Sequence, residues 1–301
     1  MIQLDPKQQE AKTRTLHWFF SSPHAPIFKI FGYAGTGKTT IVSEIVKDIE
    51  GPILYGAYTG KAAEVMNSHG MNAATIHSLI YKPIPPSKLL QDGYRDQLKS
   101  TTHSPQRRAE LETSLAEVSK LRFVLNPNSR LYGTSLLVLD ECSMIDEPML
   151  KDLLSFNVPL LVLGDPGQLP PIKGTGALVN GKPDVMLTEI HRQAKGDPII
   201  DLGWKARTGH AIEHGSYGES EVMSLKDMNS RVPMQMDQVL TGKNESRRTW
   251  NQAMRTLMHL SGTMPQVGEK LICLRNHPEI GLNNGTLCTV LEVTAFYTGI
   301  K

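Results

Sequence analysis

A glycine-rich octapeptide constrains the fold of this chain more than any other feature. It reads Gly32-Tyr33-Ala34-Gly35-Thr36-Gly37-Lys38-Thr39. An apolar run at 27–31 precedes it, and a helix-compatible stretch at 40–49 follows it. A strand, a glycine-rich turn and a helix in this order form a P-loop, in which backbone N–H groups and the helix N-terminus point at phosphate oxygens. The sequence therefore predicts an α/β domain that binds a nucleoside triphosphate.

The end of the loop supplies the chemistry that a bound triphosphate needs. Lys38 brings a positive charge to the phosphates as charge moves during catalysis, and Thr39 offers a hydroxyl to a Mg²⁺ ion that bridges two of them. The loop residues that we expect to hold ATP are Gly32, Ala34, Gly35, Thr36, Gly37, Lys38, Thr39 and Thr40.

Short runs of Ile, Leu and Val recur along the chain, each followed by a turn signal and a more polar stretch. They lie at 27–31, 53–57, 136–139, 160–163 and 185–187. Strands that are apolar on both faces are typical of a mostly parallel sheet covered by helices. Because the carboxyl ends of parallel strands meet at one edge, we expect the active crevice there.

Polar residues follow two of these runs and complete the predicted ATP site. Asp140 and Glu141 end the run at 136–139, and we expect Asp140 to face the Mg²⁺ ion while Glu141 orients or deprotonates the attacking water. Gln168 lies in a proline-rich turn after the run at 160–163. Since its amide both donates and accepts, it can sense a γ-phosphate and link nucleotide state to loop position.

The length of 301 residues predicts two domains. The first spans 1–182 and contains an insertion at about 83–135 with a helix at 106–121. The second begins at 183 and continues to 265, with helices at 198–208 and 245–259. A β-rich segment occupies 266–301, with strands at 271–274 and 286–293 around the turn signal Asn283-Asn284-Gly285.

Composition excludes several classes of protein. The 32 Lys and Arg against 30 Asp and Glu leave a net charge of +2, so any nucleic acid must bind in a local groove. The chain has no signal-like N-terminus and no apolar run long enough to span a membrane. Its three widely spaced cysteines suit neither a disulfide framework nor a zinc site, which favours a cytoplasmic location.

The motifs and their order resemble superfamily 1 DNA helicases of the RecD-like and phage Dda-like branch. The octapeptide resembles motif I, residues 140–144 resemble motif II and residues 164–171 resemble motif III. The resemblance implies RecA-like core domains, the second of them incomplete here, and an accessory domain in the insertion. It also implies an ATP-dependent, 5′ to 3′ helicase that acts on single-stranded and forked duplex DNA. We expect a monomer, and the sequence leaves protein partners and the choice between DNA and RNA open.

The resemblance adds two residues to the ATP site. Gln8 matches the glutamine motif, whose amide reads the adenine edge, and a solvated helix residue is the alternative. Arg192 matches the motif IV arginine, which reaches the γ-phosphate from the second core domain, and an ordinary surface arginine is the alternative.

The resemblance also implies a strand-binding surface. Residues 58–63 resemble motif Ia, with Tyr58 at a position where the family usually carries Pro, and residues 75–78 resemble motif Ib. The predicted DNA-binding residues are Tyr58, Thr59, Lys61, Thr75, His77 and Asn244. For His77 a structural role is the alternative, and for Asn244 a helix cap. Asn251 and Arg255 follow Asn244 in the same segment, whereas Trp204 is expected in a core.

The sequence contains no counterpart of motif V or of the arginine-bearing motif VI. We therefore expect Lys301 to end a fragment that binds nucleotide but hydrolyses it poorly, because loss of an arginine finger reduces turnover by roughly 10³ to 10⁵. Two alternatives stay open. One is another P-loop phosphotransferase, such as a small-molecule kinase, and the other is a nucleotide-dependent DNA-binding or loader module that does not unwind.

Overall fold

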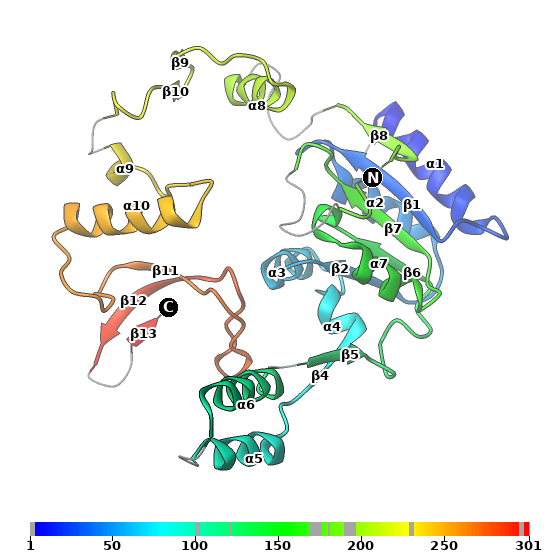
Figure 1. Ribbon diagram of the computed structural model, residues 1–301. Coiled ribbons are helices and arrows are strands. Elements are labelled where there is room, and N and C mark those ends of the chain that lie inside the picture. Colours follow the sequence, from blue (N-terminus) through cyan, green and yellow to red (C-terminus); the bar gives the residue numbers. More distant parts are fainter. Residues whose placement is uncertain are drawn as a thin grey trace. The chain divides into compact units, whose positions relative to one another are not determined.

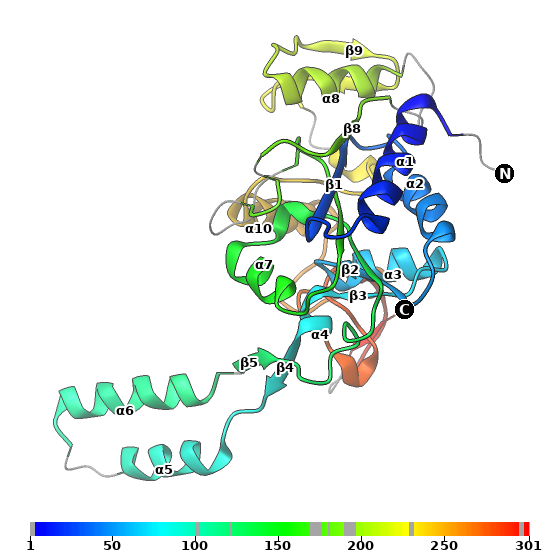
Figure 2. The ribbon, with the colours of Figure 1, turned by 90° about the vertical axis from the view of Figure 1, so that its right-hand side faces the viewer.

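The computed structural model describes residues 4–99, 103–120, 122–168, 176–179, 181–189, 197–228, 232–294 and 298–300. The chain divides into two compact units, Met1–Ile190 and His191–Lys301. The helices and strands of each unit are labelled in Figure 1 and in the rotated view of Figure 2. Among the described residues, no helix combines the length and the apolar character needed to cross a lipid bilayer.

A six-stranded sheet forms the centre of the first unit, in the order β3-β2-β6-β7-β1-β8. Its strands are β1 (Ile27–Gly32), β2 (Ile53–Ala57), β3 (Ala73–Thr75), β6 (Leu136–Leu139), β7 (Leu160–Gly164) and β8 (Val185–Leu187). Every neighbouring pair is parallel. The five apolar runs of the sequence all lie in this sheet, which confirms the predicted α/β fold with a parallel sheet.

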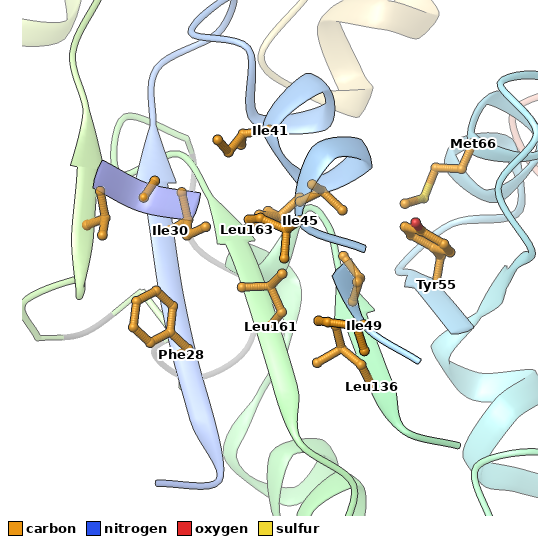
Figure 3. Close-up of a cluster of buried hydrophobic side chains, with 14 of the residues drawn as sticks. Phe28, Ile30, Ile41, Ile45, Ile49, Tyr55, Met66, Leu136, Leu161 and Leu163 are labelled. Atoms are coloured by element: carbon orange, nitrogen blue, oxygen red, sulfur yellow. The ribbon is translucent and has the colours of Figure 1, made fainter. Parts of the chain in front are cut away.

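Helices pack on both faces of the sheet. One face contacts α1 (Pro6–Phe20), α2 (Lys38–Ile45) and α3 (Gly60–Ser68), and the other contacts α4 (Ile76–Ile80) and α7 (Glu147–Leu154). Figure 3 shows Ile41 and Ile45 of α2 among the strand side chains of the first face. Both are completely buried, and such burial stabilises the fold by about 1.5 to 3 kcal/mol for each side chain.

Helix α1 begins with a capping box. The Asp5 carboxylate accepts a hydrogen bond from the backbone N–H of Gln8, and the Gln8 side chain accepts one from the backbone N–H of Asp5. Pro6 occupies the first turn, where its missing N–H costs nothing. Gln8, Ala11, Thr15 and Trp18 are buried at helical spacing, so this face of α1 is fixed on the sheet.

The topology gathers the motifs at one edge of the sheet. The P-loop follows β1, Tyr58 follows β2, Asp140 follows β6, and the turn with Gln168 follows β7. Because these four strands run parallel, their carboxyl ends lie at the same edge. The fold therefore brings these four motifs to one edge of the sheet, and the active crevice at this edge stays a prediction.

The insertion is an antiparallel ribbon that carries two helices. Strands β4 (Tyr81–Ile84) and β5 (Arg122–Leu125) pair, with α5 (Lys88–Leu98) and α6 (Pro105–Val118) between them in the sequence (Figure 2). The predicted interval of 83–135 extends too far, since residues after 125 return to the core. Leu131 is completely buried there with residues of α4 and β6.

The first unit also extends beyond its predicted end at residue 182. Strand β8 was expected to open the second domain, but it pairs with β1 in register from Ile30 opposite Val185. This pairing places 183–190 in the first unit. The reason is that β8 buries Val185 and Leu187 against the same core as α1 and α2.

The second unit contains helices and antiparallel strands. Its elements are α8 (Pro198–Thr208), β9 (Gly215–Tyr217), β10 (Ser220–Val222), α9 (Val232–Gln235), α10 (Asn244–Leu257), β11 (Lys270–Ile272), β12 (Leu287–Val293) and β13 (Thr298–Ile300). All strand pairs in the described part of this unit are antiparallel. From 266 onward, the described strands β11, β12 and β13 form an antiparallel sheet. A second parallel sheet is not found among the described residues.

Candidate nucleotide site and strand-binding surface

The P-loop has the backbone conformation that its glycines permit. Gly35 and Gly37 adopt the left-handed region, at φ 82° and 79°. An added Cβ at Gly37 would collide with Nε2 of Gln8, and one at Gly32 would lie 2.5 Å from Oγ1 of Thr36. The loop is therefore closely packed on its protein side, and a side chain at either glycine would displace it.

Lys38 is folded over its own loop. Its ammonium donates to the carbonyl oxygens of Gly32 at 2.7 Å and Tyr33 at 3.1 Å. These are neutral acceptors, whereas a phosphate oxygen is charged and forms a stronger bond with an ammonium group. The arrangement keeps the cation at the loop, where a triphosphate can compete for it.

Gln8 braces the P-loop from helix α1. Its Nε2 donates to the carbonyl oxygen of Thr36 at 3.3 Å, and the Thr36 hydroxyl donates to Tyr33 at 2.9 Å. The Gln8 side chain is buried, so it is not the solvated helix residue that was the alternative. Both ends of its amide already have backbone partners, and its reading of adenine stays a prediction.

The two carboxylates after β6 have different environments. Asp140 is partly buried, and its Oδ1 accepts from the backbone N–H of Glu141 at 2.8 Å. Burial raises the pKa of Asp140, while the Glu141 N–H and the charge of Lys38 oppose that rise. Glu141 is exposed and adopts φ 56° and ψ 43°, which is uncommon for a residue with a side chain. The chain thus turns sharply here and separates the two carboxylates.

Gln168 contacts the segment that carries these carboxylates. Its Oε1 accepts from the Ser143 hydroxyl at 3.1 Å, and its backbone N–H donates to the carbonyl of Asp165 at 3.1 Å. Ser143 is buried. No role for Ser143 was predicted, although it lies in the segment that resembles motif II, because its partner is 25 residues away along the chain.

The residues at this edge fit a magnesium-bound triphosphate. Among the described residues, no group of three or more His, Cys, Asp or Glu could hold a metal ion alone. Mg²⁺ is bound in nucleotide sites by one or two protein oxygens together with phosphates and water, so it needs no such group. The predicted ligands, Thr39 at the start of α2 and Asp140 after β6, are of this kind.

Motif Ia lies at the start of α3. The Thr59 hydroxyl accepts from the backbone N–H of Ala62 at 3.2 Å and caps this helix. Lys61 is exposed, 3.8 Å from Glu64. Tyr58 is half-buried and meets His77 edge to face, with ring centroids 6.0 Å apart. Motif Ia therefore contains an aromatic ring, Tyr58, and an exposed cation, Lys61, within one short segment.

Motif Ib forms the first turn of α4. Thr75 caps this helix by accepting from the backbone N–H of Ser78 at 3.2 Å. Burial lowers the pKa of His77, and the charge of Asp146 opposes this. The imidazole is therefore neutral near pH 7, and it can bind a base or a hydroxyl more readily than it can attract a phosphate. Its DNA-binding role stays a prediction.

The second unit contains the remaining predicted residues. Asn244 is the first residue of α10, which has no side-chain cap, and its Oδ1 accepts from Nε of Arg247 at 3.3 Å. The helix-cap alternative for Asn244 is therefore wrong. Arg255 pairs with Glu269 instead of facing solvent. Trp204 is 49% exposed and stacks on His210, so the expectation of a core position was wrong. Arg192 lies outside the described residues.

Known proteins are similar to this chain in sequence. A family profile described as an AAA domain (AAA_30) matches residues 3–232. The chain is 29% identical to the uncharacterized protein R530 of Acanthamoeba polyphaga mimivirus, over 85% of this chain and 56% of that protein. It is 28% identical to the ATP-dependent RecD2 DNA helicase of Deinococcus radiodurans, over 61% of this chain and 21% of that protein.

The fold is similar to solved helicase structures. The Pif1 helicase from Bacteroides, in complex with ADP-AlF3 and single-stranded DNA, superimposes with a TM-score of 0.51 at 17% identity, over 100% of this chain and 72% of that one. The chain spans about half the length of R530 and about a fifth of RecD2. The similarity at this identity concerns the fold.

Proposed function

This chain belongs to the AAA domain family, within the RecD-like and Pif1-like branch of superfamily 1 helicases, and from that premise we propose its activity. We propose that it couples ATP hydrolysis to 5′ to 3′ movement along single-stranded DNA and to separation of a forked duplex. A single observation carries this proposal. The P-loop, Asp140, Gln168 and Tyr58 follow four parallel strands whose carboxyl ends share one sheet edge.

In this proposal, Thr39 and Asp140 would hold Mg²⁺, which would supply positive charge to the triphosphate when bound. Lys38 leaves its carbonyl partners and binds the phosphates, while Gln8 supports the loop and reads adenine. Glu141 orients the attacking water. The loop glycines together with Ala34, Thr36 and Thr40 line the phosphates, and Arg192 completes the charge at the γ-phosphate.

The strand would lie over the motif Ia and Ib loops. Tyr58 and His77 offer rings to bases, and Thr59, Lys61 and Thr75 offer polar groups to phosphates. Such contacts hold a strand without reading its sequence, which suits a translocase. We propose Asn244, on α10, as a further contact to the strand. A monomer is sufficient for these contacts, and three free cysteines suit a reducing cytoplasm.

The test measures binding of an ATP analogue and of a single-stranded oligonucleotide, in the presence of Mg²⁺. We expect Lys38→Ala to weaken analogue binding by at least about tenfold and to remove the effect of the analogue on oligonucleotide affinity. Lys47→Ala is the matched control, because it also removes one lysine, and this lysine lies outside the P-loop and pairs with Glu44. If Lys38→Ala leaves both properties unchanged, the proposal fails.

A strand-displacement assay with the full-length protein distinguishes the alternatives. Displacement of the forked strand supports a helicase, whereas nucleotide-dependent DNA binding without displacement supports a loader. Transfer of phosphate to an acceptor other than water would establish a phosphotransferase.

A further inference from the structure

Four aromatic rings from different elements of the first unit form a row. Tyr58 follows β2, His77 lies on α4, Tyr81 begins β4 and Phe123 lies on β5. The ring centroids of successive members are 6.0, 5.8 and 6.5 Å apart. Distances of this size are typical of interacting aromatic pairs. The row runs from the motif Ia loop onto the ribbon formed by β4 and β5.

The ribbon offers an exposed aromatic ring to a single strand. Phe123 is 53% exposed and lies on the same face of the ribbon as Tyr81, because Pro83 pairs with Phe123 and Tyr81 pairs with Leu125. The exposed cations Lys82 and Arg122 lie on the opposite face, and the two strands contain no Asp or Glu that would repel a phosphate. Aromatic rings stack on bases of any sequence, so the contact that the ribbon offers to a strand is the ring of Phe123.

The Tyr81 hydroxyl ties the ribbon to another part of the fold. It donates to Oδ2 of Asp152 at 2.6 Å, and the bond is half-buried. Burial and the nearby charges of Asp152 and Asp146 raise the pKa of the Tyr81 hydroxyl. The hydroxyl therefore stays protonated at neutral pH and acts as a donor to a charged acceptor, which is one of the stronger classes of hydrogen bond.

Asp152 belongs to a helix that is fixed in the core. Asp146 caps the N-terminus of helix α7, and its Oδ1 accepts from the backbone N–H of Met149 at 3.0 Å. Met149 and Leu153 are buried in the cluster that includes β6. Tyr81 is thus hydrogen-bonded to an element that lies directly after motif II in the chain.

The base of the ribbon has a second attachment, at α4. The backbone N–H of Asn126 donates to the carbonyl of Ile80 at 2.8 Å, and the Ser129 hydroxyl donates to the carbonyl of Leu79 at 2.6 Å. These bonds hold the ribbon where it leaves the core. The hydrogen bond from the Tyr81 hydroxyl to Asp152 adds a contact with α7 and restricts the direction in which the ribbon extends.

We propose that Tyr81 is a positioning residue whose hydrogen bond to Asp152 holds the ribbon in line with Tyr58 and His77. In this position, Phe123 extends the strand-binding surface beyond motif Ib to a longer stretch of single-stranded nucleic acid. The inference rests on the proposed function, because it assumes that Tyr58 and His77 contact the strand. The ring of Tyr81 is not required for this role, but its hydroxyl is.

The experiment compares two oligothymidylates, of about 6 and about 16 nucleotides, by fluorescence anisotropy with the full chain. We expect Tyr81→Phe to weaken binding of the longer oligonucleotide by about three- to tenfold and to leave the shorter one and the ATP analogue unaffected. Asp152→Ala should do the same, because it removes the acceptor of the Tyr81 hydroxyl. The double variant should bind the longer oligonucleotide no more weakly than either single variant, because each change removes the same hydrogen bond. The number of positions at which an oligonucleotide of a given length can bind is the same for all variants, so it cancels when their affinities are compared.

Two controls separate positioning from general stability. Tyr132→Phe removes a hydroxyl from an exposed tyrosine that packs on Phe156, and it should change neither affinity. Phe123→Ala removes the proposed contact itself and should reproduce the selective loss on the longer oligonucleotide. The inference is overturned if Tyr81→Phe weakens both lengths equally or neither, or if Phe123→Ala has no effect. Failure of the wild-type chain to bind either length would instead sink the proposed function.

Discussion

Gln8 connects the capping box of α1 to the phosphate loop through both ends of its amide. Its Oε1 accepts from the backbone N–H of Asp5, and its Nε2 donates to Thr36. We expect Gln8→Ala to lower the free energy of unfolding by about 1 to 2 kcal/mol, because a buried carbonyl loses its donor and the helix loses half of its capping box. Denaturant unfolding without nucleotide measures this loss.

The same variant tests the adenine role. If Gln8 also reads the base, Gln8→Ala should reduce affinity for ATP more than for GTP. Gln9→Ala, on the exposed side of the next position, is the control and should leave stability and selectivity unchanged. An equal loss of affinity for both nucleotides would restrict Gln8 to supporting the loop.

Asp140 allows the magnesium assignment to be tested separately from nucleotide binding. In the wild-type chain, we expect Mg²⁺ to strengthen binding of an ATP analogue, and we expect Asp140→Asn to remove most of that gain, since a neutral amide is a poorer ligand for a hard cation. Calorimetric titration with and without Mg²⁺ gives the two affinities. Asp96→Asn, an exposed change on α5, should retain the full effect of Mg²⁺. An unchanged magnesium dependence in Asp140→Asn would remove this residue from the metal site.

At the residue scale, the sequence predicted contacts within motifs but not between them. Lys38 and Thr36 lie in one loop, so the spacing of the P-loop predicts that they act together. Ser143 with Gln168, and Tyr81 with Asp152, are pairs distant in sequence, and a single sequence contains no signal for such pairs. Arg255 lies in the segment of the second unit that was expected to touch the strand, and its ion pair with Glu269 was not predicted.

At the scale of elements, five of the six strands in the parallel sheet were predicted almost to the residue, because a short apolar run between turn signals is typical of a buried strand. The edge strand β3 was not predicted, since Ala73–Thr75 is too short to form such a run. Helix ends were predicted less well. The helix expected at 106–121 begins at Pro105, after the Ser104 cap, and ends at Val118. Ser119 caps its C-terminus, and no glycine or proline follows directly, so this end of the helix has no stop signal in the sequence.

Gly164 shows how closely the elements around the site are packed. It ends β7, and an added Cβ would lie 2.7 Å from Sγ of Cys142 and 2.8 Å from the ring of Phe31. We expect Gly164→Ala to destabilise the first unit by about 1 to 3 kcal/mol, because the buried ring and thiol cannot both move aside. Gly93→Ala on α5 is the control, since nothing lies within 4 Å of its added Cβ. Equal unfolding free energies for the two variants would contradict this packing argument.

The ion pair of Arg255 and Glu269 joins α10 to the segment before β11. Glu269 also accepts from the backbone N–H of Gln266, and Arg255 donates to the carbonyls of Gly262 at 3.2 Å and Met264 at 3.0 Å. We expect Glu269→Gln to cost about 1 to 3 kcal/mol, because the partly buried guanidinium loses its counter-charge. Thermal unfolding followed by circular dichroism measures the change. Glu221→Gln on exposed β10 should have no effect, and a similar loss in both variants would show that the pair is not responsible.

At the scale of the whole molecule, the division into two units was predicted from length, but the boundary was not. An apolar run such as 185–187 predicts a strand without identifying the sheet that it joins, and here it joins β1. The same limit applies to the insertion. Its proline-rich opening marked the start of a separate element, whereas the return to the core at Leu131 depends on burial that a sequence does not display.

The two units should respond differently to nucleotide. The predicted loop, carboxylate and amide ligands of ATP, except Arg192, lie within Met1–Ile190, so a bound analogue should stabilise that unit by about 2.7 kcal/mol at a concentration 100-fold above its dissociation constant. Hydrogen exchange measures how strongly the bound analogue protects the backbone amides of each segment. We expect the strongest protection in peptides covering 32–45 and 136–144, with less change in α10. Lys38→Ala should remove the protection at matched concentration. Protection that survives in this variant, or that is greatest in α10, would show that the analogue binds elsewhere.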